Sequence, residues 1–165
     1  IVIPAAGEGR DAIYAAKLGW DVYAFDLSKQ GEAKAMKLAR QQHVQIHYVS
    51  IDALKIQFPL ESFDVIMSTY FHTAPEVRPE IHAKYIKWLK PGGTLFLEGF
   101  NKRQLSFTSG GPKHIEWLFS SEILATDFQS LKIQLNEEKQ RILNEGPLHQ
   151  GMAEVIQFCA TKTLM

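Results

Sequence analysis

The 165-residue chain has little of several features that would define a specialised class of protein. It contains one cysteine, Cys159, which excludes an internal disulfide framework and a metal site built from several cysteines. No apolar run approaches the roughly 18 residues that a membrane-spanning helix needs. The 18 basic and 18 acidic residues cancel, so no excess charge points to nucleic acid or a membrane surface as a partner.

The beginning of the chain lacks an initiator methionine and a signal-peptide pattern. Because the first residues already have the pattern of a strand, we expect further residues to precede them. Apolar residues make up 45% of the chain and charged residues 22%, which is ordinary for a soluble globular protein. Length and composition predict a single domain over residues 1–165 in a reducing, cytoplasmic setting.

The first ten residues combine a strand, a loop of small residues and the start of a helix. Residues 1–3 predict a buried strand that breaks at Pro4, followed by the loop Ala5-Ala6-Gly7-Glu8-Gly9 and a helix from Arg10 to Leu18. This order lets a backbone approach a nucleotide-like ligand closely, since glycine allows φ > 0 and leaves room that a Cβ would fill. Taken alone, the loop is equally consistent with a tight turn that binds nothing.

Strands and helices alternate through most of the chain. We expect strands at 21–26, 46–51, 63–68 and 94–99, and helices at 28–42, 75–90 and 120–128. The segment Pro91-Gly92-Gly93 is placed to stop the 75–90 helix. Two further strand-like runs, 132–143 and 152–161, have no helical pattern between them and predict an antiparallel hairpin. The prediction is an α/β protein with a doubly wound, mostly parallel sheet and helices on both faces.

Acidic and polar residues stand where the predicted strands end. In open α/β sheets the ligand lies beyond the carboxyl ends of the strands. The second strand ends at Asp26, Asp52 follows the third, and the fourth ends in Ser68-Thr69-Tyr70. An acid at Asp26 suits the two hydroxyls of a ribose, and one at Asp52 suits an exocyclic amine such as that of adenine. With the glycine loop they predict an adenosine whose tail carries little negative charge.

Six segments extend this pattern over the chain from its first residue: Ala6-Gly7-Glu8-Gly9-Arg10, Asp26, Ile51-Asp52-Ala53, Phe63-Asp64-Val65-Ile66, Leu89-Lys90-Pro91-Gly92-Gly93 and the terminal hairpin. Together they resemble the class I S-adenosylmethionine-dependent methyltransferases. Within that family, three segments resemble the small-molecule branch related to tellurite-resistance and thiopurine methyltransferases. They are Gly7-Glu8-Gly9-Arg10, Gly110-Gly111-Pro112-Lys113, and Glu145-Gly146 followed by His149 and Gly151. The resemblance implies a Rossmann-like seven-stranded sheet of order 3-2-1-4-5-7-6.

The resemblance also implies roles for particular positions, with S-adenosylmethionine as the cofactor. The loop of Ala5, Ala6, Gly7, Glu8 and Gly9 would line the methionine moiety, and Arg10 would begin the following helix. Asp26 would hold the ribose with Leu27 near the adenine, and Asp52 and the Ala53 backbone would bond the adenine. Ser68 and Thr69 would lie under the sulfonium and face the substrate.

Two positions depart from the family pattern. The family usually has an acid in the first strand where this chain has Ile3, and a glycine where it has Ala5. Binding of the cofactor's amino group would then rest on backbone carbonyls.

Methyl transfer from a sulfonium needs in-line positioning and exclusion of water, and a base only where the nucleophile must lose a proton. The resemblance implies a small-molecule acceptor, such as a thiol, a metalloid or a similar soft nucleophile. The candidates for a base or a substrate contact are His72, His149 and Tyr70, each of which also suits a structural role. No metal ligand set is expected.

The remaining histidines and the cysteine are expected to have structural or solvated roles. We predict that Cys159 is a buried small hydrophobe and that residues 136–141 form the solvated face of a strand. Glu98 is placed to face the pocket. The histidines predicted to be solvated are His43, His47, His82 and His114.

Two other functions remain open. The segment Gly7-Glu8-Gly9 with Ala12 satisfies a loose dinucleotide fingerprint, so an NAD(P)-dependent oxidoreductase is one alternative. A non-catalytic module that binds S-adenosylmethionine is the other, because of Ile3 and Ala5. The expected partner is a small-molecule substrate, with no nucleic acid or membrane, for a monomer or weak homodimer.

Overall fold

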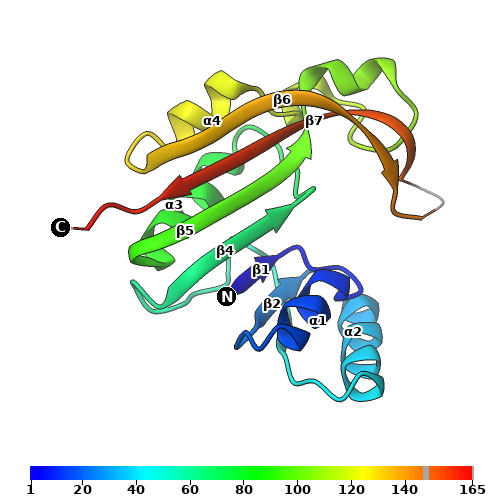
Figure 1. Cartoon of the computed structure of the whole chain (residues 1–165), viewed down its shortest axis with the longest axis vertical. Coiled ribbons are helices and arrows are strands. Elements are labelled where there is room, and N and C mark those ends of the chain that lie inside the picture. Colours follow the sequence, from blue (N-terminus) through cyan, green and yellow to red (C-terminus); the bar gives the residue numbers. More distant parts are fainter. Residues whose placement is uncertain (147–148, 165) are drawn as a thin grey trace.

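The computed structural model describes residues 1–146 and 149–164 and shows a seven-stranded sheet with helices packed against it (Figure 1). The strands are β1 (Val2–Pro4), β2 (Tyr23–Asp26), β3 (His47–Ser50), β4 (Phe63–Thr69), β5 (Leu89–Phe100), β6 (Lys132–Asn144) and β7 (Gln150–Thr161). The helices are α1 (Arg10–Lys17), α2 (Lys29–Gln41), α3 (Arg78–Trp88) and α4 (Ser121–Asp127), with short 3₁₀ helices η1 (Lys102–Ser106) and η2 (Ile115–Trp117).

The strand order is β3-β2-β1-β4-β5-β7-β6. Strands β1 to β5 pair in parallel, whereas β7 runs antiparallel to both β5 and β6. The predicted fold class, including the order implied by the resemblance and the terminal hairpin, is confirmed. The order reverses between β1 and β4, so the loop after β1 and the end of β4 lie at the point where such sheets bind ligands.

Helices cover both faces of the sheet because successive residues of a buried strand point in opposite directions. Ile3 of β1 and Ala24 of β2 join the apolar cluster under α1 and α2. Their neighbours Val2 and Phe25 join the larger cluster that includes Trp88 of α3 and residues of α4. This two-sided burial explains why β1 and β2 consist of almost uninterrupted apolar residues.

The Pro-Gly-Gly segment does not end the third helix as predicted. Helix α3 ends at Trp88, and β5 begins at Leu89 instead of Thr94. The register steps from Phe63 opposite Leu89 to Val65 opposite Thr94, so residues 90–93 form an irregularity within β5. A Cβ at Gly93 would lie 2.9–3.1 Å from three backbone oxygens. The glycine is therefore required by strand packing.

His82 was predicted to be solvated, and this is wrong. It is buried between α3 and α4, where its Nδ1 lies 2.7 Å from Asp127 Oδ2 and its ring stacks on Phe128. The other histidines predicted to be solvated, His43, His47 and His114, are exposed. The i and i+4 pattern of α3 predicts a buried face, but it does not show that the opposing helix presents a carboxylate there.

The predictions for β6 and β7 need two smaller corrections. Cys159 is half-buried, and its thiol donates to Gln134 Oε1 at 3.2 Å, so it is more than an apolar filler. The stretch 136–141 is partly engaged, because Glu138 accepts a hydrogen bond from the Ser121 backbone and Arg141 faces a cleft. Among the helices in the described residues, none has the length and apolarity needed to cross a membrane.

Candidate functional site

Two adjoining cavities lie beyond the carboxyl ends of the parallel strands, and Ala5 lines both. The larger one, of about 940 Å³, is called here the charged cleft and is lined by the loop after β1, the end of β4, and residues of β5, β6 and the hairpin tip. The smaller one, of about 380 Å³, is called the apolar pocket and lies beyond β2 and β3. In Figure 1 the β6–β7 hairpin arches over the ends of β4 and β5 toward the side of the sheet where α1 begins.

The loop after β1 is held on both sides of Gly7. The Gly7 N–H donates to Asp26 Oδ2 at 3.0 Å, and its carbonyl accepts from the Tyr48 hydroxyl at 2.6 Å. Burial, with the nearby Asp26 carboxylate, raises the pKa of Tyr48, so this phenol remains a donor. Gly7 has φ of 53°, and a Cβ there would meet no atom within 4 Å. The loop therefore presents an open backbone surface.

Gly9 and Ala5 differ from the expectation for a ligand-contacting glycine loop. A Cβ at Gly9 would lie 2.5 Å from Ala35 Cβ, so this glycine is needed for the close approach of α1 and α2. Ala5 has φ of 50°, a left-handed conformation that glycine adopts more easily. Ala5 therefore holds a backbone conformation that is strained for alanine and would not be strained for glycine.

The two acids of the apolar pocket are held by backbone donors. Asp26 accepts from Gly7 N–H and, through Oδ1, from Ser28 N–H at 2.9 Å. Asp52 Oδ1 accepts from Leu54 N–H at 2.9 Å. A carboxylate has about four acceptor positions, so both acids retain capacity for a ligand. Leu27 also lines this pocket with 74% of its surface exposed, which leaves an apolar side chain for a flat ring to cover.

The far wall of the charged cleft is a polar network, called here the cleft cluster, of Tyr70, Glu98 and Arg141. The Tyr70 hydroxyl donates to Glu98 Oε1 at 2.7 Å, and the Arg141 guanidinium binds the same oxygen. Arg141 also pairs with Glu145 at 3.2 Å, while Arg10 donates to the Glu145 carbonyl at 3.0 Å. These bonds connect the hairpin tip to the first residue of α1 across the cleft.

Tyr70 has a strained backbone and a phenol that stays protonated. Its φ is 51°, a conformation that costs energy in a bulky residue and is concentrated at functional sites. Burial and the hydrogen bond to Glu98 raise the pKa of its phenol, so the hydroxyl stays protonated at neutral pH. Because that proton is donated to Glu98, the phenol presents only its lone pairs to a ligand.

Both ring nitrogens of His72 are used inside the protein. Its Nε2 accepts from Phe100 N–H at 3.0 Å, which places the proton on Nδ1, and Nδ1 donates to the Trp117 carbonyl at 2.9 Å. Burial lowers the pKa of His72 to about 4. His72 therefore joins the end of β5 to η2 and has no lone pair left to act as the predicted base.

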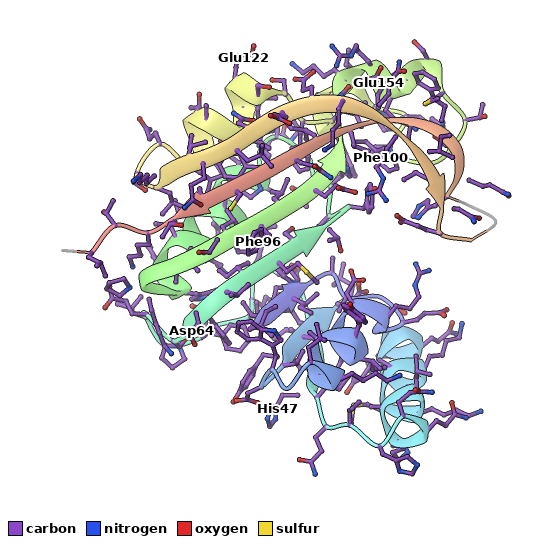
Figure 2. All side chains as sticks on the ribbon, in the orientation of Figure 1. His47, Asp64, Phe96, Phe100, Glu122 and Glu154 are labelled. Atoms are coloured by element: carbon purple, nitrogen blue, oxygen red, sulfur yellow. The ribbon has the colours of Figure 1, made fainter. Side chains whose placement is uncertain are left out.

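A third cavity of about 360 Å³ lies beside Tyr70 and is lined mainly by aromatic rings. His149 lines both this cavity and the charged cleft, 5.8 Å from the Tyr70 ring. The loop over the cavity is held by a buried network in which Asn101 donates to Glu154 Oε2 and Gln104 accepts from Glu154 N–H. Figure 2 shows Phe100 at the carboxyl end of β5, with Glu154 beyond it near the 3₁₀ segment.

The structure brings most of the predicted site residues together around these cavities. Those that line the charged cleft are Ala5, Ala6, Gly7, Glu8, Arg10, Thr69, Tyr70 and His149. Those that line the apolar pocket are Ala5, Asp26, Leu27, Asp52, Ala53 and His72. Gly9 is packed against α2, and Ser68 is 2% exposed within the core, so neither lines the cavities.

The sequence pattern does not predict a role in the site for Asp11, Tyr48, Arg141 and Glu145, which the structure places at it. Asp11 follows Arg10 in the first turn of α1, and an acid at that position was a usable signal. Arg141 and Glu145 carry no local signal, because they lie far along the chain from the residues they face: Glu145 is 135 residues from Arg10, whose side chain donates to its carbonyl.

Comparisons with known proteins show the family to which the chain belongs. The sequence model described as "Methyltransferase domain" matches residues 1–93. Phosphoethanolamine N-methyltransferase 3 of Arabidopsis thaliana is 30% identical over 94 residues, which are 56% of this chain and 19% of that protein. The chain thus spans about a fifth of the length of this curated relative.

Solved structures share the fold over nearly the whole chain. A SAM-dependent methyltransferase of Methanosarcina mazei has a TM-score of 0.79 at 20% identity, covering 99% of this chain and 92% of that one. TehB of Haemophilus influenzae has a TM-score of 0.78 at 18% identity, covering 98% of this chain and 57% of that one. The 1,6-didemethyltoxoflavin N1-methyltransferase of Burkholderia thailandensis has a TM-score of 0.73 at 20% identity, covering 99% of this chain and 71% of that one. Because the domain model matches more than half of its residues, the chain belongs to the methyltransferase family that its motifs resemble, whose cofactor is S-adenosylmethionine.

Proposed function

We propose that residues 1–165 act as one methyltransferase domain that moves the methyl group of S-adenosylmethionine to a small-molecule acceptor. The observation that carries the proposal is the junction of two cavities at Ala5. One is apolar and contains two acids, which suits adenosine, and the other is charged and suits an amino acid moiety.

The residues of the apolar pocket fit an adenosine. We assign the ribose hydroxyls to Asp26, whose position is held by two backbone donors. The adenine ring covers Leu27, and its amine donates to Asp52 while the Ala53 backbone bonds a ring nitrogen. A bidentate contact to a carboxylate is among the stronger hydrogen-bond arrangements in proteins.

The loop from Ala5 to Arg10, together with Thr69, forms the methionine side of the proposed site. The open space at Gly7 lets the ligand lie against the backbone, where a Cβ would meet no protein atom but would occupy the ligand's place. When bound, S-adenosylmethionine supplies a methyl group on a positively charged sulfur. The protein's part is to hold the acceptor in line with that methyl and to exclude water.

We assign the acceptor to the region between the charged cleft and the third cavity, beside Tyr70 and His149. The Tyr70 hydroxyl accepts a hydrogen bond from the acceptor and orients it, since its own proton is donated to Glu98. His149 remains the candidate base, because the nitrogens of His72 are occupied. A soft nucleophile such as a thiol or a metalloid needs no strong base, so this acceptor class fits a site in which His72 is not available as a base.

An amine is the second acceptor class to test, because the Arabidopsis relative is named as an N-methyltransferase. Transfer assays with radiolabelled cofactor would compare a thiol panel, tellurite and an amine panel. The Tyr70→Phe variant should raise KM for the productive acceptor more than it lowers cofactor affinity. An unchanged KM would remove Tyr70 from the acceptor site.

Calorimetric titration tests the cofactor assignment. S-adenosylhomocysteine should bind, and Asp26→Ala should weaken it by roughly 1.5–3 kcal/mol, as expected for a hydrogen bond to a charged group. A reduced nicotinamide dinucleotide should not bind. Saturable binding of the dinucleotide alone would support the oxidoreductase alternative, and cofactor binding without transfer to any acceptor would support a non-catalytic module.

A further inference from the structure

The first strand carries Ile3 at the position where the family pattern has an acid. This side chain is fully buried in the cluster under α1 and α2. The position therefore places no charge in the cleft. Its backbone lies inside the sheet, where β1 pairs in parallel with β2. Any carboxylate that meets the cofactor's amino group must come from another element.

Asp11, in the first turn of α1, is placed to be that carboxylate. It lines the charged cleft together with Ala5, Ala6 and Thr69. Its Oδ2 accepts a hydrogen bond from Thr69 Oγ1 at 2.8 Å, which joins the start of α1 to the end of β4. This bond holds the carboxylate at the point where the sheet order reverses.

The charge of Asp11 has no ionic partner among the described residues, which distinguishes it from the other acids of the cleft. Glu8 pairs with Lys34 at 2.5 Å, and both Glu98 and Glu145 pair with Arg141. Arg10, although adjacent in sequence, donates to the Glu145 carbonyl. Asp11 thus presents an uncompensated negative charge with at least one oxygen open to a ligand.

We propose that Asp11, oriented by Thr69, binds the α-ammonium group of the cofactor and takes the place of the acid expected at the position of Ile3. The inference rests on the proposed function, since it concerns the amino acid moiety of the same ligand. A carboxylate in the first turn of a helix is also favourable for the helix dipole. The test must therefore separate binding of the ammonium group from helix stability.

The experiment titrates two ligands into the wild-type chain and the Asp11→Asn variant. S-adenosylhomocysteine carries the ammonium group without the sulfonium charge, and its deaminated analogue lacks only the amino group. Asparagine keeps an oxygen that accepts from Thr69 and removes the charge. We expect S-adenosylhomocysteine to bind the variant about tenfold to a hundredfold more weakly, because a hydrogen bond to a charged group is lost. The deaminated analogue should lose less than about twofold.

Glu80→Gln is the matched control. Glu80 is likewise an exposed acid in the first turn of a helix, α3, but lines none of the cavities described above. It should leave the affinity ratio of the two ligands at the wild-type value. Equal weakening of both ligands by Asp11→Asn, or no weakening of either, overturns the role of Asp11. Failure of the wild-type chain to bind S-adenosylhomocysteine overturns the proposed function itself, and the inference with it.

Discussion

Two polar clusters in this protein use similar residues for different purposes. The interior cluster, Arg78, His82 and Asp127, joins α3 to α4, and Asp127 Oδ2 accepts from Arg78 at 2.8 Å and lies 2.7 Å from His82 Nδ1. In the cleft cluster of Tyr70, Glu98 and Arg141, the carboxylate likewise accepts from the two other members, and it also accepts from Gln157 Nε2. Both connect elements far apart in the chain.

The surroundings of the two clusters are what differ. The Asp127 side chain is 8% exposed and the His82 side chain 5%, and His82 stacks on Phe128 at 4.6 Å, so no ligand can reach them. The Arg141 side chain is 37% exposed to a cleft, and Tyr70 holds a left-handed backbone. Burial without backbone strain is typical of a cluster that stabilises the fold, whereas exposure to a cavity together with strain is what we expect of the proposed acceptor site.

The largest expected effect is in the interior cluster. Asp127→Asn leaves Arg78 and His82 without their carboxylate, and breaking a buried pair in this way costs roughly 3–5 kcal/mol of unfolding free energy. Urea denaturation followed by circular dichroism measures the loss. The affinity of the folded variant for S-adenosylhomocysteine should be unchanged. A variant as stable as the wild type would show that this cluster does not hold α3 to α4.

The pH dependence of stability compares the histidines of the two regions. Burial lowers the pKa of His72, to about 4, and that of His82. The unfolded chain, with histidine pKa values near 6.5, then binds more protons than the folded one below that pH. The unfolding free energy should fall as the pH is lowered from about 6.5 to 4, with His72 contributing about 3 kcal/mol.

Urea midpoints measured at several pH values between 7.5 and 4 give this slope. The variant His72→Asn, whose amide supplies a donor and an acceptor without titrating, should show a shallower slope than the wild type. Identical slopes would mean that His72 is not the neutral, doubly bonded ring described above.

A matched substitution in the cleft cluster should cost less stability than the one in the interior. Glu98→Gln removes one carboxylate charge, as Asp127→Asn does, but Arg141 is partly solvated, so we expect a loss of about 1–2 kcal/mol in unfolding free energy. The variant should instead disturb acceptor binding through Tyr70. A stability loss equal to that of Asp127→Asn would assign both clusters the same structural role.

The smallest expected effect concerns backbone strain beside the cleft. Ala5→Gly relieves a left-handed alanine and should raise the unfolding free energy by about 0.5–1 kcal/mol after the entropy of the unfolded chain is included. Ala6→Gly is the control, because Ala6 is not in a left-handed conformation. This variant should have an unfolding free energy that is lower than that of the wild type by a similar amount. A loss for Ala5→Gly as well would show that φ at Ala5 stores no strain.

Much of the fold could be predicted because its signals are local. The alternation of apolar strands with helices whose apolar residues recur every three or four positions gave correct elements, with boundaries wrong by up to five residues at β5. Asp26 and Asp52 were found for the same reason, since the end of a strand is visible in the sequence. For Gly9 the sequence predicts ligand contact, because nothing local shows that α2 brings Ala35 against it.

The sequence by itself determined the order and kind of the elements, the acids at the strand ends, and the family resemblance, because each depends on residues within a few positions of one another. Only the tertiary structure decided that His72 is a structural ring, that His82 meets Asp127, and that Asp11 meets Thr69 at the cleft. These contacts join segments 45 to 58 residues apart, and the Arg10–Glu145 contact spans 135. The folded sheet, and no local pattern, brings such segments together.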